Sequence, residues 1–166
     1  MNPRILACAG TAIAILATAG QAEDATFTTR NLTTETALKA AQAAMHMCRG
    51  EGFQVSVAVV DRGGAVQVVL RDRFASPGSP DIAKGKAATA ASFKMPTSDL
   101  DRELQPGRPT AGIRNLPNVV AVAGGVPIEA GGSLVGGIGV SGAPGPANDE
   151  RCARAGIKAI AEDLEL

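Results

Sequence analysis

The sequence has 166 residues, with 16 basic and 16 acidic side chains, one histidine, four phenylalanines, and neither tryptophan nor tyrosine. The balanced charge argues against a nucleic acid or an anionic membrane as the partner, and the few aromatic rings argue against recognition by stacking. The length fits one domain with a single hydrophobic core.

Residues 1–22 have the three parts of a secretory signal peptide: a basic residue, a run of small and apolar residues at 5–19, and a small-x-small cleavage site. The run of about 15 residues is shorter than the roughly 20 that span a membrane, so we expect no membrane insertion after cleavage. We therefore expect a periplasmic or secreted protein. Residues 23–31 would form an exposed N-terminal segment, and residues 32–166 the folded domain.

Cys48 and Cys152 remain after the predicted cleavage. An even number of cysteines in an oxidising compartment favours a disulfide between them. Two buried thiols are the alternative, because cysteine is among the most buried residue types.

A helix and a hairpin are predicted first along the chain. Residues 33–49 open with a Thr cap and an acidic residue, and their apolar positions recur every three or four residues, which is typical of one helical face. Two β-branched runs, residues 55–60 and 66–70, follow. They are separated by an Asp and Gly turn at 61–64, which predicts a β-hairpin.

A second helix is predicted over residues 81–95, capped by Asp81 and ending before Pro96. The connection at 97–118 contains three prolines, so it has room for only a short helical turn near Leu100. Connections of this length are often functional.

Three strand-like pieces, residues 119–124, 126–129 and 133–140, come next, with a glycine turn between the last two. Glycine inside a strand indicates a bulge or the close approach of other backbone, and we expect a ligand or another subunit there. A final helix, capped by Asn148 or Asp149, would run to about residue 165. This order predicts an α+β fold in which an antiparallel sheet of about five strands is flanked by helices. The terminal helices would share one face, which would bring the two cysteines together.

Familiar catalytic patterns are missing from the sequence. The single histidine limits any Ser/His/Asp triad, and no Gly-x-Ser-x-Gly elbow surrounds a serine. A zinc site made of several His and Cys residues is not available. The glycine-rich residues 136–142 lack the lysine of a phosphate-binding loop.

A few polar residues stand out as candidate ligand-binding residues. His46 lies at the edge of the apolar stripe of the first helix, where a boundary histidine and a metal or haem ligand are both open readings. Arg71, Lys86, Glu129 and Asp149 lie at a strand end, inside a helix or beside glycine-rich turns, where capping or solvation is the alternative role.

Several separated motifs occur in an order that resembles the GlcG/HbpS-like family: VAVVDRGG at 57–64, KAATA at 86–90, GGVPI at 124–128 and GIGVSG at 137–142. The resemblance runs from about Leu32 to the C-terminus. It implies a profilin/PAS-like sandwich, a homo-oligomer from dimer up to octamer, and haem or a related tetrapyrrole as ligand. A related module ends some corrinoid adenosyltransferases.

Two functions are therefore expected. In the first, the protein binds haem or a related tetrapyrrole in an apolar, glycine-lined cleft. His46 or a methionine would be the axial ligand, and Lys86, Arg71 or Arg114 would pair with propionates. In the second, the protein acts on a small carboxylate at an oligomer-interface pocket, as an enzyme or accessory factor that uses Lys86, Arg71 and Asp149 or Glu150. A structural oligomer without a ligand is the third reading.

Overall fold

The computed structural model describes residues 25–165, so the predicted signal peptide at 1–22 lies outside the described part of the chain. Residues 25–31 are exposed. No helix within the described residues is long and apolar enough to cross a membrane. In chain order the elements are α1 (Thr34–Gly50), β1 (Ser56–Asp61), β2 (Val66–Arg71), α2 (Ser79–Phe93), α3 (Thr97–Glu103), the 3-10 helix η1 (Ala111–Asn115), β3 (Gly125–Ala130), β4 (Ser133–Ser141), α4 (Pro146–Lys158) and α5 (Ala161–Leu164).

The strands form one sheet in the order β2-β1-β4-β3, and every neighbouring pair is antiparallel. The predicted α+β class is confirmed, with four strands where about five were expected. The difference comes from residues 119–124, which run over α2. There the Val120 amide donates to the Thr89 hydroxyl at 2.9 Å, and the Val120 side chain packs against Gly85. This segment is therefore held by a helix over most of its length, and its last residue meets β4, where the Val140 amide donates to the Gly124 carbonyl at 2.9 Å.

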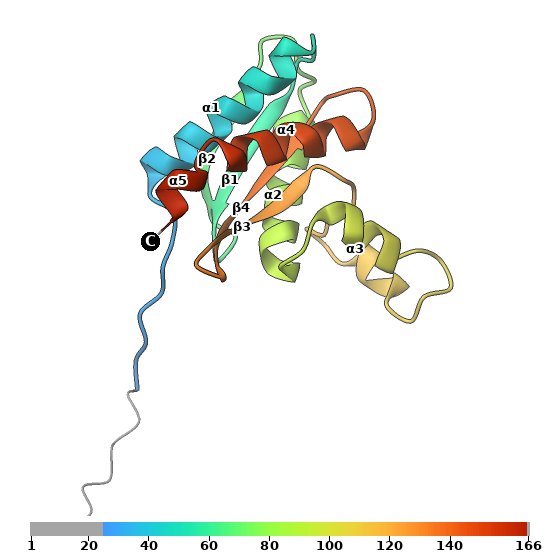
Figure 1. Ribbon diagram of the computed structural model, residues 1–166. Coiled ribbons are helices and arrows are strands. Elements are labelled where there is room, and N and C mark those ends of the chain that lie inside the picture. Colours follow the sequence, from blue (N-terminus) through green and yellow to red (C-terminus); the bar gives the residue numbers. More distant parts are fainter. Residues whose placement is uncertain (1–24, 166) are drawn as a thin grey trace, which may run out of the picture.

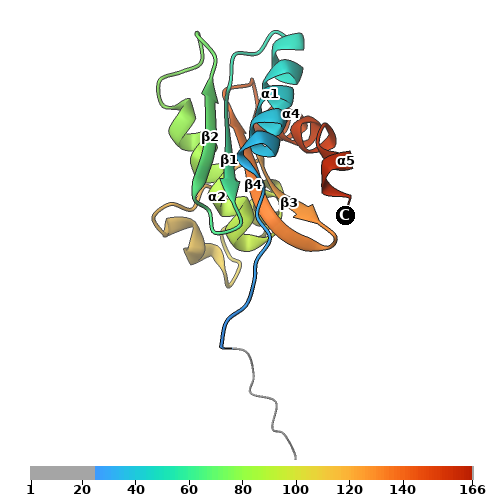
Figure 2. The ribbon, with the colours of Figure 1, turned by 90° about the vertical axis from the view of Figure 1, so that its left-hand side faces the viewer.

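The sheet lies between two layers of helices (Figure 1). Seen from the side, α1 and α4 cover one face and α2 covers the other (Figure 2). Strand β1 shows why both faces are apolar: Val57 and Val59 belong to the core with α1 and α4, whereas Ala58 and Val60 pack with α2. Successive side chains of a strand point to opposite faces, so the central strand supplies both cores.

A disulfide between Cys48 and Cys152 joins α1 to α4, with a sulfur–sulfur distance of 2.05 Å, and confirms the predicted pairing. Both cysteines are fully buried. Close packing accompanies the bond, because a Cβ added at Gly156 would lie 2.6 Å from the Ala40 carbonyl oxygen. The predicted sharing of one sheet face by the terminal helices is likewise observed.

Helix α2 approaches the glycine-rich strands closely. A Cβ on Gly125, Gly137 or Gly139 would lie 2.1–2.5 Å from carbonyl oxygens of α2; the nearest of these, 2.1 Å from Gly139, belongs to Ala83. The close approach that the glycines predicted is real, but the partner at these three strand glycines is the chain's own helix. The sequence predicts a ligand or another subunit at these positions, and α2 occupies them instead.

Two predicted helix starts differ from the structure. Helix α2 begins at Ser79 after Gly78, and Asp81 pairs instead with Lys84 at 2.7 Å. Helix α4 begins at Pro146 after Gly145, which leaves the Asp149 side chain inside the first turn and free to face the core. The last predicted helix is also divided, into α4 and the short α5.

Candidate functional site

Of the six predicted ligand-binding residues, the structure brings Lys86 and Asp149 into contact. The Lys86 Nζ donates to Asp149 Oδ2 at 2.8 Å and to the Val140 carbonyl at 2.9 Å. The other carboxylate oxygen accepts the Ala143 amide at 2.9 Å. The two side chains are only 2% and 6% exposed.

Gly124 makes room for this buried ion pair. Its φ of +124° is a conformation that favours glycine, and an added Cβ would lie 2.8 Å from the Lys86 Nζ and 2.9 Å from the Asp149 Cβ. The pair links α2 to the end of β4 and the start of α4. Because each charge is satisfied by protein groups, this arrangement holds the helices in place and offers no open ligand position.

The other four predicted residues lie apart on separate elements. His46 is exposed on α1, and Glu129 is exposed on β3. The Arg114 guanidinium, in η1, pairs with Asp101 at 2.7 Å. Within residues 25–165, no group of three or more His, Cys, Asp or Glu side chains is placed to hold a metal ion.

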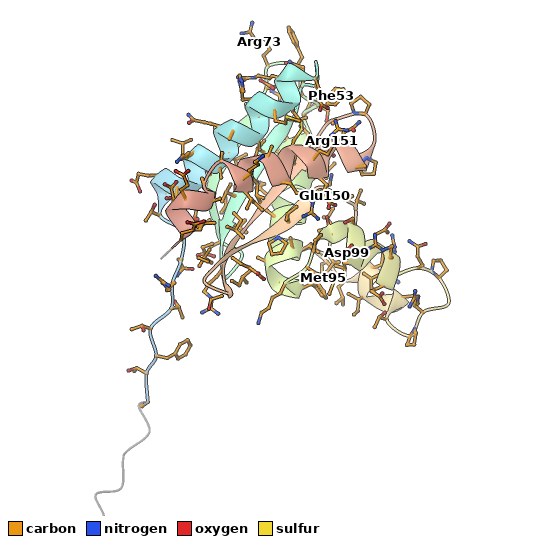
Figure 3. The ribbon with its side chains drawn as sticks, in the orientation of Figure 1. Phe53, Arg73, Met95, Asp99, Glu150 and Arg151 are labelled. Atoms are coloured by element: carbon orange, nitrogen blue, oxygen red, sulfur yellow. A yellow bond between two sulfur atoms is a disulfide. The ribbon has the colours of Figure 1, made fainter. Side chains whose placement is uncertain are left out.

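Arg71 belongs to an arginine-rich end of the molecule, where Figure 3 places Arg73. Its guanidinium donates to the Ala75 carbonyl. Nearby, the Arg49 Nε donates to Asp72 Oδ1 at 2.8 Å, and this hydrogen bond raises the pKa of the guanidinium above its usual value. The Arg49 side chain is half exposed, so water screens the pair.

A cavity of about 550 Å³ lies along the outer surface of α2. We call it the α2 groove. It is lined by Gly64, Val66, Asp81, Lys84, Gly85, Ala88, Asn118 and Val120. Its volume falls in the range of roughly 300–1,000 Å³ that is usual for small-molecule sites.

Local sequence explains both walls of the groove. One wall is the β1–β2 hairpin turn, where the Asp61 carboxylate accepts the amides of Gly63 and Ala65 at 2.8 and 2.9 Å. The other wall is the segment that carries Val120, which fits only because residue 85 has no Cβ: an added one would lie 2.5 Å from Val120 Cγ2. A glycine inside a helix costs about 1 kcal/mol relative to alanine. Gly85, inside a predicted helix, was therefore a signal for the groove, and the sequence predictions did not include it.

The groove combines a small, apolar surface with one cation. Val66, Gly85, Ala88 and Val120 present little side-chain bulk, so a flat ligand can lie close to the helix. The Lys84 ammonium is held 2.7 Å from Asp81, and the two side chains are 40% and 80% exposed. Such an exposed pair contributes about 1 kcal/mol or less. Lys84 therefore has donors available for a carboxylate.

Two other cavities are smaller. One, of about 400 Å³, lies where the N-terminal segment passes the end of α5. The other, of about 230 Å³, lies between α4 and the start of α3, and Figure 3 labels Glu150 and Arg151 of α4 in this region. Both of its arginines are occupied, because Arg154 pairs with Glu150 and Arg151 pairs with Glu51.

A family model described as "Haem degrading protein HbpS-like" matches residues 32–158. The crystal structure of a double mutant of Streptomyces reticuli HbpS is 42% identical, with a TM-score of 0.77, and the match covers 89% of this chain and 98% of that one. The crystal structure of a PduOC:haem complex is 30% identical, with a TM-score of 0.74 and coverage of 78% and 95%. Protein GlcG of Escherichia coli K12 is 34% identical over 89 residues, which are 54% of this chain but only 65% of GlcG. The chain belongs to the HbpS-like family, which confirms the resemblance that its sequence motifs indicated.

Proposed function

We propose that this protein is an exported binding protein for haem or a related tetrapyrrole, and that the macrocycle occupies the α2 groove. The observation that carries the proposal is the groove itself, a cavity of about 550 Å³ with small apolar walls and one lysine. A haem-bound relative of the same fold supports the ligand class. The buried Cys48–Cys152 disulfide supports export, because such bonds persist in oxidising compartments.

The lining residues fit the organic part of the ligand. Val66 and Val120 would contact the apolar edges of the ring, and the low bulk of Gly85 and Ala88 would let its face lie along α2. Lys84 would donate to a propionate, a charge-assisted hydrogen bond. When bound, haem would supply redox chemistry at its iron, and the protein would supply binding and orientation.

His46 lies on α1, on the other side of the sheet from the α2 groove (Figure 2). A haem in the groove of the same protomer is therefore out of its reach. An axial role for His46 requires a macrocycle on the α1 surface, or one shared with another copy of the chain in the homo-oligomer that we propose, from dimer up to octamer. A macrocycle in the α2 groove should be lost when a lining residue is enlarged, whereas one on the α1 surface should be lost when His46 is replaced.

The test is a haemin titration followed by the shift of the Soret band, with four forms of the protein. Ala88→Leu fills the groove, and Ala161→Leu is its control, because it adds the same side chain at an exposed position of α5. His46→Ala removes the imidazole. We expect Ala88→Leu to abolish the shift, and Ala161→Leu and His46→Ala to keep it.

Two outcomes would contradict this proposal. No shift at low micromolar wild-type protein would overturn tetrapyrrole binding and leave a structural oligomer without a ligand. A shift that survives Ala88→Leu and disappears in His46→Ala would move the macrocycle to α1 and overturn the groove.

The small-carboxylate hypothesis has less support. It uses Lys86, Arg71 and Asp149 or Glu150 as groups that contact the substrate. The Arg71 guanidinium donates to the Ala75 carbonyl. The structure commits Lys86 and Asp149 to each other, and Glu150 Oε1 accepts two hydrogen bonds from Arg154. No specific observation favours catalysis at these positions.

A further inference from the structure

We infer that the α2 groove recognises the ring and the carboxylates of a tetrapyrrole but not its metal, so that metal-free porphyrins bind about as tightly as haem. The inference rests on the proposed function and specifies its ligand class. Its basis is the set of donor atoms that the groove presents.

None of the residues that line the groove carries an imidazole, thiol, thioether or phenol. These are the groups that hold haem iron in proteins. The chain has no tyrosine and one histidine, and that histidine is on α1. The cysteines of the described region, Cys48 and Cys152, are joined in a buried disulfide. Met45 and Met47 belong to α1 as well, and Met95, which follows α2, packs against Leu100 and Leu104 and does not line the groove.

The polar groups that do line the groove are poor partners for iron. The Lys84 ammonium, paired with Asp81, has no lone pair to donate while it is protonated. Asp81 is 80% exposed and already accepts from Lys84 at 2.7 Å. The Asn118 side chain offers a neutral amide. Affinity must then come from apolar contact and from the attraction between Lys84 and a propionate.

These contacts are the same whether or not the ring holds a metal. We therefore expect the dissociation constants of haemin, zinc protoporphyrin and metal-free protoporphyrin to agree within about threefold, because an iron–nitrogen bond made by the protein would separate them by more than tenfold. Lys84→Leu, which adds no iron ligand, should weaken all three by the same factor, about three- to tenfold, since the lost hydrogen bond is charge-assisted but half exposed.

A porphyrin dimethyl ester provides the matched ligand, because it keeps the ring and lacks the carboxylates. Wild type and Lys84→Leu should bind the ester equally. Lys158→Leu, which removes an exposed lysine from α4 on the opposite face of the sheet, should leave the affinity for all four compounds unchanged. Ala88→Leu should abolish binding of all four.

The measurements are fluorescence titration for the metal-free and zinc porphyrins and Soret absorbance for haemin. A preference of more than tenfold for haemin, or a bound-haem spectrum typical of nitrogen or sulfur coordination, would overturn the inference while the proposed function stands. Failure of wild type to bind haemin or any porphyrin would overturn the proposed function itself. Equal weakening of acid and ester by Lys84→Leu would overturn the role of Lys84.

Discussion

Replacing Lys86 by methionine should destabilise this protein strongly, because it leaves the Asp149 carboxylate buried without its counter-ion. The two side chains are 2% and 6% exposed, and their charged atoms are 2.8 Å apart. Removing one partner of a buried pair costs about 3–5 kcal/mol. The Val140 carbonyl also loses a donor. A loss of about 4 kcal/mol is a large share of the roughly 5–15 kcal/mol that stabilises a typical domain.

The double variant Lys86→Met/Asp149→Asn should recover part of this loss. It removes both charges, and the asparagine oxygen can still accept the Ala143 amide that Asp149 now accepts at 2.9 Å. We expect the double variant to be about 1–2 kcal/mol more stable than Lys86→Met alone, because no uncompensated charge remains in the core. Lys158→Met, at an exposed position, should change stability by about 0.5 kcal/mol or less.

Equilibrium urea unfolding of the oxidised proteins at neutral pH measures these differences as shifts of the midpoint at constant slope. The reasoning fails if Lys86→Met costs no more than Lys158→Met, because the lysine would then be solvated or unpaired in solution. It also fails if the free-energy changes of the single variants Lys86→Met and Asp149→Asn simply add in the double variant, since a contacting pair must show a coupling energy.

Two further predictions concern the packing on each face of the sheet. Reduction of the Cys48–Cys152 bond, which spans 104 residues, should lower the free energy of unfolding by about 2–5 kcal/mol by freeing the unfolded chain; equal urea midpoints with and without reductant would contradict this. Gly139→Ala should cost about 2–3 kcal/mol, because its Cβ would lie 2.1 Å from the Ala83 carbonyl and force α2 off the sheet. Gly112→Ala, with nothing within 4 Å, is the control, and equal stability of the two alanine variants would refute the packing argument.

Local sequence patterns predicted the elements whose hydrogen bonds lie within a short stretch of the chain. The hairpin at β1 and β2 followed from two valine-rich runs and a turn in which Asp61 accepts amides of that same turn. Residues 119–124 look like a strand by the same criterion. Their main partner is α2, through Thr89, which is 31 residues before Val120, and through Gly85. Alternation of apolar residues shows that a segment is half buried but not what buries it, so this difference could not have been foreseen.

For the candidate site, the sequence likewise does not show which side chains meet. Lys86 and Asp149 were selected for their chemistry, and nothing in the sequence shows that they meet, because they are 63 residues apart. Lys84, two residues from Lys86, was not selected. A lysine in a helix is usually solvated, and its place in a groove became visible only once Val120 was seen to fold over Gly85.

The buried pair and the groove are connected through α2. The helix rotates by about 100° per residue, so the anchor that turns Lys86 into the core also turns Lys84, Gly85 and Ala88 outward. The glycines of β3 and β4 fix the same helix from the other side by letting its backbone rest on the sheet. Lys86 is therefore a positioning residue for the groove.

At a temperature where Lys86→Met is still fully folded, the affinity of this variant for metal-free protoporphyrin should fall. Its affinity for the dimethyl ester should fall as well, because the whole groove is displaced. Lys84→Leu should lose only the affinity that depends on carboxylates. If Lys86→Met binds both compounds like wild type, the groove keeps its shape without the ion pair and the two features are independent.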